Sequence, residues 1–240
     1  MTKLKIIAAA FCSVIGMATA SAQWAVRADL GVMCYYSITP AESHVGIMPG
    51  FGAQVGADYD MHVKGTFYVT PGLYWSYRAA VSGNFSGSDL DSEFLQEHFL
   101  NVPLYAKWKF DIKPDKFGMY VYCGPTVSFC LASYSKLDMS ASGYHITGTY
   151  DYLAKKADFG DGNMASILEY EIESYGLGLS WVDIRADLGV GFVFKRNNEL
   201  VLGFDLGALD RTDNNLPEKS FMNSCNFYLG YRYRFGKKQQ

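Results

Sequence analysis

Apolar and polar residues alternate over long stretches of the chain. The stretch Val182–Phe194 reads VDIRADLGVGFVF, in which each even-numbered residue is apolar while the odd-numbered residues before Val193 are Asp, Arg, Asp, Gly and Gly. A period of two residues indicates a β-strand, because successive side chains of a strand point to opposite faces of the sheet. The stretch exceeds the about 5–6 residues usual in a soluble sheet and suffices for the about 9–11 residues with which a tilted strand crosses a bilayer.

The same alternation recurs along the chain from Trp24 onward. It predicts eight strands, and eight is the smallest common number of strands in a membrane barrel. The predicted strands cover residues 24–34, 47–59, 67–78, 100–110, 120–131, 182–194, 200–208 and 226–235.

The polar faces of these strands carry Gly, Tyr and charges of both signs, which neutralise one another if they share a narrow lumen. We therefore expect the apolar face to meet lipid and the polar face to line the lumen. Lipid allows no open sheet edge, so the sheet must close. The predicted fold is all-β, a closed eight-stranded antiparallel up-and-down transmembrane β-barrel. The charged residues predicted to form a structural network facing the lumen are Arg27, Asp29, Asp58, Arg78, Lys107, Lys109, Asp183, Arg185, Asp187, Asp205, Arg232 and Arg234.

Short and long connections alternate between the predicted strands. In outer-membrane barrels the short turns face the periplasm and the long loops face outward, which places both ends of the barrel domain in the periplasm. Outward aromatic residues are expected to form an interfacial girdle at that end. The short turns are 60–65, 113–118 and 195–199, the long loops are 37–46, 80–97, 134–170 and 211–222, and the girdle residues are Trp24, Tyr59, Phe67, Trp108, Phe110, Phe194, Tyr233 and Phe235.

Two features interrupt the pattern. Just before the strand at 182–194, Leu177, Leu179 and Trp181 share the parity of Asp183, so the inward face turns apolar. Either a bulge near Ser180 shifts the register or these side chains plug the lumen. Prolines inside predicted strands each remove a backbone donor, so we expect bulges or strand ends there. These prolines are Pro49, Pro71, Pro103 and Pro125.

Residues 1–22 have the features of a secretory signal. Lys3 and Lys5 precede the apolar run Ile6–Met17, and small residues follow it. We predict cleavage at the end of this segment, which leaves residues 23–240 as one outer-membrane β-barrel domain.

The charge of the chain excludes one class of partner. Removal of the signal takes away two lysines and no acidic residue, so the formal net charge falls from −3 to −5. A mildly acidic chain has no basic surplus to displace counterions from phosphates, so no nucleic-acid partner is predicted. No segment after the signal offers the roughly 20 consecutive apolar residues of a transmembrane helix, which excludes a helical membrane protein.

Residue patterns for metal or cofactor chemistry are sparse, and no cofactor, metal site or catalytic residue is predicted. Asp158–Asn163 is rich in oxygen ligands but lacks the spacing and the closing Glu of an EF-hand, which favours a polar turn. The cysteines of the barrel domain fit neither metal-ligand spacing nor a dense disulfide framework, so they are interpreted as isolated strand residues. They are Cys34, Cys123, Cys130 and Cys225.

Two groups of residues have the types that nucleophilic catalysis requires, a nucleophile with a base. They are His98 with Ser92 and Glu97, and His145 with Ser142. No histidine lies on a predicted inward strand face, so solvated loop histidines are the favoured interpretation.

Four strand motifs carry a family resemblance. They are Asn101–Lys107 (NVPLYAK), Tyr122–Pro125 (YCGP), Asp183–Gly191 (DIRADLGVG) and Phe227–Phe235 (FYLGYRYRF). Together they resemble the PorT-like outer-membrane β-barrel family found in Bacteroidota, over essentially the whole chain after the signal. The resemblance implies the barrel fold and the outer membrane of a Gram-negative cell. Members are mostly of unassigned role, and the namesake belongs to a secretion apparatus; the acidic loop 134–170 departs from the family pattern.

Three functions stay open. The preferred one is a non-enzymatic barrel that anchors exposed loops or binds an envelope partner. Its recognition surface is expected in loop 134–170, because loops over about 12–15 residues are usually functional or disordered. An equally favoured interpretation of this loop is a solvated lid or a hairpin extended above the membrane. The alternative functions are an outer-membrane lipid hydrolase or acyltransferase, and a narrow ion channel. The expected partners are outer-membrane lipid, the barrel-assembly machinery and an envelope protein bound through the outer loops.

Overall fold

The structure is a computed structural model of the whole chain. It describes residues 23–39, 44–83, 90–113, 117–141, 144–160, 163–174, 176–195, 197–213 and 221–235. The predicted signal, residues 1–22, lies outside the described residues.

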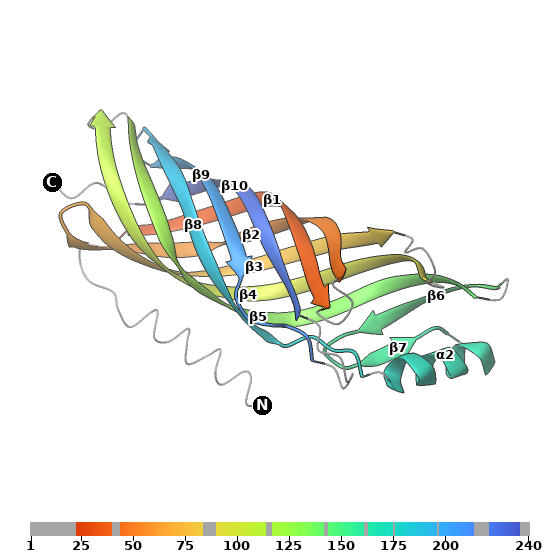
Figure 1. Cartoon of the computed structure of the whole chain (residues 1–240). Helices are drawn as coiled ribbons and strands as arrows, with labels where there is room; N and C mark the ends of the chain where they lie inside the picture. Colours follow the sequence, from red (N-terminus) through yellow and green to blue (C-terminus); the bar gives the residue numbers. More distant parts are fainter. Residues whose placement is uncertain are drawn as a thin grey trace.

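Within the described chain, eight strands close into an antiparallel ring (Figure 1). Each strand pairs with its neighbour in the ring, and the last strand returns to pair with the first. The predicted fold, a closed eight-stranded antiparallel barrel, is confirmed. In ring order the strands are β1 (Gln23–Thr39), β2 (His44–Lys64), β3 (Phe67–Gly83), β4 (Leu90–Lys113), β5 (Phe117–Ala141), β8 (Val182–Phe194), β9 (Asn198–Gly207) and β10 (Phe221–Arg234).

The predicted loop 134–170 is in fact a folded extension of the barrel. The outer part of β5, Tyr134–Ala141, pairs with β6 (Tyr144–Asp151), which pairs in turn with β7 (Lys156–Asp158), and helix α2 (Asn163–Ser174) follows. We call these four segments the outer platform; Figure 1 shows it projecting from one end of the ring. Of the two interpretations of this segment, the extended hairpin is confirmed, because β5 continues for 25 residues and its outer part pairs with β6, well past the about 9–11 residues needed to cross a bilayer.

Two other predicted outer loops are shorter than expected for the same reason. β3 runs to Gly83 and β4 begins at Leu90, so most of the predicted loop 80–97 is strand. β1 and β2 likewise extend to Thr39 and from His44. The barrel wall therefore rises beyond the membrane on the outer side.

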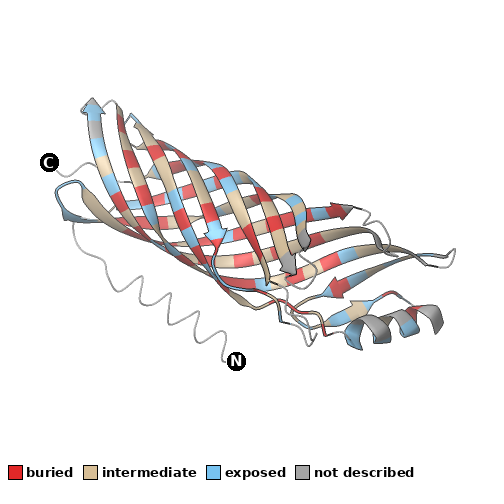
Figure 2. Ribbon diagram, in the orientation of Figure 1, coloured by how far each residue is buried: buried red, intermediate tan, exposed pale blue. Residues whose placement is uncertain are grey.

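The two faces of the wall differ as the alternation predicts. Along β1, Arg27 and Asp29 are buried inside the ring, whereas Leu30 and Val32 remain 71% and 68% exposed on the outside. Figure 2 shows this alternation as bands of buried and exposed residues along each strand. Burying charge while exposing leucine and valine is unfavourable in water, so this surface suits an apolar surrounding. No helix in the described part of the chain is long and apolar enough to cross a bilayer.

Outward aromatic residues gather at the end of the ring opposite the platform. The Trp24 and Tyr59 rings are 4.8 Å apart between centroids, and the Phe67 and Trp108 rings are 5.1 Å apart. Tyr59 is buried beneath its neighbours, whereas Trp24 is 49% exposed. Aromatic rings in this position match an interfacial girdle.

One bulge reverses the facing of residues on the outer part of β5. His98 on β4 is opposite Ala132, but the next residue, Phe99, is opposite Cys130, so Leu131 is an extra residue. A bulged residue leaves the strand's alternation shifted by one. Even-numbered residues of β5 face the lumen before Leu131, and odd-numbered ones such as Ser133 face it afterwards.

The prolines lie inside strands, so the expectation of bulges or strand ends at them was wrong. Pro49, Pro71, Pro103 and Pro125 sit in β2, β3, β4 and β5, and the register shifts occur elsewhere. Two pairs are missing from the ladder beside Pro71, and two more between Pro103 and Cys123, before pairing resumes in the same register. Local gaps therefore accommodate the missing donors of Pro71, Pro103 and Pro125 without displacing the strands, whereas Pro49 pairs with Cys34 in an uninterrupted ladder.

The apolar residues before Asp183 are not part of a strand, because β8 begins at Val182. Leu179 is buried and forms an isolated bridge with Thr212, and the amide of Cys130 donates to the carbonyl of Trp181 at 2.7 Å. The alternation is thus interrupted by irregular chain that crosses the outer end of the ring, not by a bulge near Ser180.

Candidate functional site

The half of the lumen opposite the outer platform holds a dense ionic network around Arg232. Its guanidinium pairs with Asp58, with Asp60 at 3.0 Å and with Glu199 at 2.6 Å. Lys107 and Lys109 approach Asp60 at 2.8 Å and 2.6 Å. Asp60 and Glu199 were assigned to periplasmic turns from the sequence, yet both are buried. They continue the inward parity of β2 and β9, so the alternation itself is the signal that identifies them.

Above this network the lumen is filled by tyrosines. Tyr105, Tyr120, Tyr122 and Tyr228 form a buried cluster, and the guanidinium carbon of Arg27 lies 5.1 Å from the Tyr228 ring centroid. Arg27 also donates to Asp29 at 2.8 Å. A cation over aromatic rings is stabilised by their electron-rich faces.

Glycines on the inward face of β8 and β9 make room for these rings. A Cβ atom at Gly191 would overlap the Tyr120 ring, and one at Gly203 would overlap the Tyr228 ring. The inward glycines of the alternating stretch 182–194 therefore serve packing, because a residue without a side chain leaves space for a tyrosine on the neighbouring strand, as Gly191 does for its direct partner Tyr120.

A second ionic group lies nearer the outer side. Arg185 pairs with Asp183 at 2.9 Å and with Asp205, and it donates to the carbonyl of Ser224 at 2.9 Å. Asp187 takes no part in an ion pair described by the structure; its carboxylate accepts a bond of 3.4 Å from the Tyr105 hydroxyl. Of the predicted inward-facing charges, Lys109 and Arg234 are half-buried and the others are buried.

Arg78 differs from the other inward cations in its partners. It has no carboxylate partner among the described ion pairs, and its guanidinium lies 4.5 Å from the centroid of the Phe99 ring. The predicted residues therefore do not form one network. Two ionic groups, around Arg232 and around Arg185, lie apart from the Arg27–Asp29 pair, while Arg78 and Asp187 belong to no ion pair among those described.

The outer end of the lumen is closed by Glu97 and Arg211. The Arg211 guanidinium donates two bonds to the Glu97 carboxylate, at 2.9 Å and 2.7 Å, and both side chains are buried. Both residues were assigned to outer loops from the sequence. Tyr152 of the outer platform reaches the same region and donates to Glu93 at 2.5 Å. An apolar layer that includes Met33, Tyr35, Ala80 and Leu95 packs beneath it.

These layers predict that the purified barrel does not conduct ions. An eight-stranded interior is just wide enough for its side chains to fill, and here ionic, aromatic and apolar layers follow one another. In planar bilayers we expect no stepwise conductance above that of protein-free membranes. Reproducible single-channel steps from the parent protein would contradict the closed lumen.

The two histidine groups that were weighed against solvated histidines are not assembled as catalytic sites in the described residues. Glu97 points into the lumen toward Arg211, whereas His98 is outside, with its ring 5.6 Å from that of Trp75. Adjacent strand residues face opposite sides of the wall, so the two cannot act together. His145 lies 2.8 Å from Asp138 on the outer platform, and its proposed partner Ser142 lies outside the described residues.

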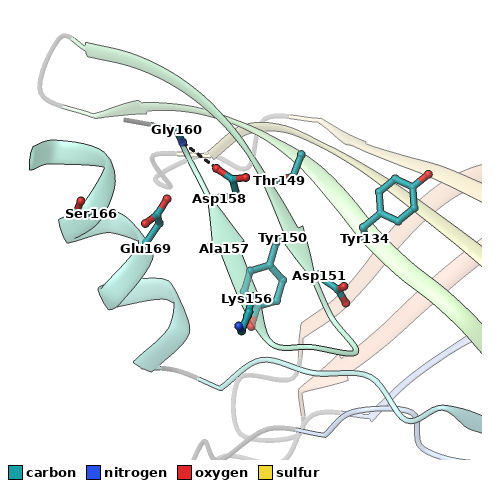
Figure 3. Close-up of a pocket in the computed structure, with 10 residues that line it drawn as sticks. All are labelled: Tyr134, Thr149, Tyr150, Asp151, Lys156, Ala157, Asp158, Gly160, Ser166 and Glu169. Atoms are coloured by element: carbon teal, nitrogen blue, oxygen red, sulfur yellow. Dashed lines mark hydrogen bonds between the residues drawn. The ribbon is translucent and has the colours of Figure 1, made fainter. Parts of the chain in front are cut away.

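The outer platform carries an open groove of about 820 Å³ (Figure 3). One wall is α2, with Ser166 and Glu169, and the other is formed by β6 and β7. Glu169 accepts a bond of 2.8 Å from the amide of Phe159, which ties the helix to the strands. The lining residues are Tyr134, Thr149, Tyr150, Asp151, Lys156, Ala157, Asp158, Gly160, Ser166 and Glu169.

Tyr150 lines this groove, and a hydrogen bond holds its side chain in place. Burial, together with the nearby Glu173 and Asp151 carboxylates, raises the pKa of Tyr150, so its hydroxyl stays protonated. That hydroxyl donates to the carbonyl of Leu177 at 2.6 Å. The groove is thereby anchored to the irregular chain that leads into β8.

The segment Asp158–Asn163 shows a polar turn at its described start. The Asp158 carboxylate accepts a bond of 3.1 Å from the amide of Gly160 (Figure 3), and Asp161 and Gly162 lie outside the described residues. Among the residues that are described, no group of three or more His, Cys, Asp or Glu side chains is placed to hold a metal ion.

Comparisons with known proteins identify the family of this barrel. A search of curated sequences found no match. Among solved structures the chain is similar to Neisserial surface protein A (12% identity, TM-score 0.44, 88% of this chain and 97% of that chain) and to Ail of Yersinia pestis (13%, 0.33, 88% and 98%). It is also similar to the outer membrane enzyme PagL (14%, 0.39, 85% and 98%). The model of the outer membrane protein beta-barrel domain family matches residues 19–208, so the chain belongs to this family, which places it in the outer membrane of a Gram-negative cell.

Proposed function

We propose that the chain is a non-enzymatic outer-membrane barrel whose outer platform binds a protein of the cell envelope. The observation that carries this proposal is the construction of the platform. It continues strand β5 of the wall and is tied down by the Tyr152–Glu93 and Tyr150–Leu177 hydrogen bonds. Its groove and helix are thus held in a fixed position above the membrane, as a preorganised binding surface requires.

The exposed side of α2 gives this surface its apolar contacts. Ile167 and Tyr170 are 61% and 79% exposed, and residues three apart share one side of a helix. Large apolar side chains exposed outside the membrane, rimmed by polar residues, are typical of protein-binding sites. The neighbouring groove adds Asp158 and Glu169 as polar partners.

The arrangement around the histidines supports the non-enzymatic part of the proposal. Glu97 is committed to Arg211 inside the lumen, while His98 packs against aromatic rings on the outer face. Neither contact orients a base toward a nucleophile, which is the geometry that acyl transfer demands.

The proposal extends to a PorT-like barrel of Bacteroidota type, for which the strand motifs such as Asn101–Lys107 and Phe227–Phe235 are the support. A barrel of this kind is folded by the barrel-assembly machinery, and its apolar face contacts outer-membrane lipid. Identification of the captured partner will decide whether the barrel takes part in a secretion apparatus.

The double variant Ile167→Ser/Tyr170→Ala tests the platform. In native envelopes treated with a chemical cross-linker, the parent should yield a defined adduct with an envelope protein. The variant should lose at least about 90% of it, because truncating central contacts of an interface costs about 2 kcal/mol or more. Adducts are quantified by mass spectrometry after capture of the barrel.

Leu209→Ser is the matched control, since Leu209 is an exposed apolar residue, 41% exposed, in the connection between β9 and β10. It should leave the adducts unchanged. Equal heat-modifiable migration on gels verifies that all variants assemble. If the double variant keeps the parent's full set of adducts, the platform is not the recognition surface.

A further inference from the structure

The closing pair of strands brings two cysteines together. Cys34 on β1 is directly opposite Cys225 on β10, and both are half-buried free thiols. On the flanking strands the same row continues with Pro49 and Leu206. The row lies on the outward face, because it shares the parity of the exposed Val32 and Phe227.

We propose that Cys34 and Cys225 form a disulfide bond that joins the first and last strands of the barrel covalently. The two cysteines lie far apart along the chain, so the sequence alone did not indicate the pairing, and they were interpreted as isolated strand residues. The β1–β10 register runs without a shift from Ala25–Arg234 to Ile38–Phe221, so the two cysteines are held opposite each other by pairs on both sides.

The backbone spacing suits such a bond. The amide of Phe235 donates to the carbonyl of Trp24 at 2.7 Å, and these two residues continue the same register as direct partners. Hydrogen-bonded pairs recur every second residue, so Cys34–Cys225 is also of this type, with a Cα separation of about 5.5 Å. Disulfides have Cα separations of about 4.4–6.8 Å, most often about 5.5–6 Å.

The side chains need a small approach. Opposed strand residues have Cβ atoms about 4.5–5.5 Å apart, whereas a disulfide brings them to about 3.5–4.5 Å. The two cysteines are direct partners in the register, and the Cys34 thiol donates to the carbonyl of Tyr35 at 3.3 Å. A bond that draws the strands together by roughly 1 Å is mildly strained, so it is more readily reduced than a relaxed disulfide.

The remaining cysteines do not compete for this pairing. Cys123 is exposed on the outer face of β5, across the ring from the closing strands, and Cys130 is buried inside the wall. Cys130 approaches the Glu97 carboxylate rather than a thiol.

The oxidation balances when a protein disulfide serves as the oxidant. The two thiols together lose two protons and two electrons as the sulfur–sulfur bond forms. A disulfide-bearing oxidoreductase of the periplasm takes up both electrons and both protons and becomes a dithiol. The barrel passes through this oxidising compartment on its way to the outer membrane, where disulfides form and persist.

The test is peptide mapping of protein isolated from outer membranes. Free thiols are trapped with acid and iodoacetamide at lysis, and the protein is digested with trypsin without reductant. We expect a linked pair of peptides, 28–64 and 220–232, which carry Cys34 and Cys225. Reduction should separate them, while Cys123 and Cys130 should be alkylated before reduction. Alkylation of Cys34 and Cys225 in more than half of the molecules would overturn the proposal.

A second measurement uses variants. The parent should unfold in urea at a lower midpoint after reduction, because a bond that closes a long loop restricts the unfolded chain. Cys34→Ser/Cys225→Ser should show the lower midpoint with or without reductant. Cys123→Ser, the matched control, should respond to reductant as the parent does. A parent midpoint that ignores reductant while the linked peptides are absent rejects the bond.

Discussion

Leu188→Arg should prevent most of the protein from folding into lipid vesicles. Leu188 lies at the centre of β8 and is 54% exposed on the outer face of the wall. An arginine on the lipid face of a barrel costs about 2–4 kcal/mol at the membrane midplane. Each 1.4 kcal/mol is about a factor of ten, so the folding equilibrium should shift by roughly 30-fold to several hundredfold.

The yield is measured as the heat-modifiable fraction on gels and as the urea midpoint in vesicles. The matched control is Leu209→Arg, which places the same charge on an exposed leucine outside the strands. A surface change of that kind is usually worth less than about 0.5 kcal/mol. Equal yields for Leu188→Arg and the parent would show that this face does not meet lipid.

Arg232→Met should lower the free energy of unfolding by about 3–5 kcal/mol, which is the usual penalty for removing one partner of a buried ionic group. Arg232 is buried between Asp58, Asp60 and Glu199. Methionine fills much of the volume but leaves these carboxylates without their shared cation. Urea titration in lipid vesicles provides the measurement.

Lys155→Met is the control for the Arg232→Met variant, since it also removes the cation of an ion pair. Lys155 lies 3.2 Å from Asp213 on the outer surface, where the Asp213 side chain is 65% exposed. Exposed pairs contribute about 0–1 kcal/mol. Should Lys155→Met prove as damaging as Arg232→Met, the lumen network does not stabilise the barrel.

The fold was predictable because inward and outward side chains alternate along most of each strand of the wall. Where a strand keeps its period of two, its facing follows from the sequence, as for Arg185 in β8 or Arg232 in β10. Even Asp60 and Glu199 follow this alternation, and they were missed only because one strand was ended before Asp60 and another was begun after Glu199. Acidic residues beside a predicted turn were interpreted as solvent-exposed, although the alternation places them on the inward face of the wall.

Other parts depend on contacts that no local pattern contains. The inward position of Ser133 follows from the extra residue Leu131, and a single bulge has no signature in the alternation. Arg211 belongs to no strand and reaches Glu97 across the lumen. The opposition of Cys34 and Cys225 depends on the pairing of the first strand with the last, which no local pattern contains.

The glycine and tyrosine packing inside the wall links pairs of positions in evolution. Because the Tyr120 ring occupies the space that a Cβ atom at Gly191 would need, a larger residue at 191 requires the ring to move or a smaller residue at 120. Gly203 and Tyr228 depend on each other in the same way. Substitutions on the lumen side are therefore expected to come as paired changes on neighbouring strands, whereas one aliphatic residue of the lipid face should replace another independently of its neighbours.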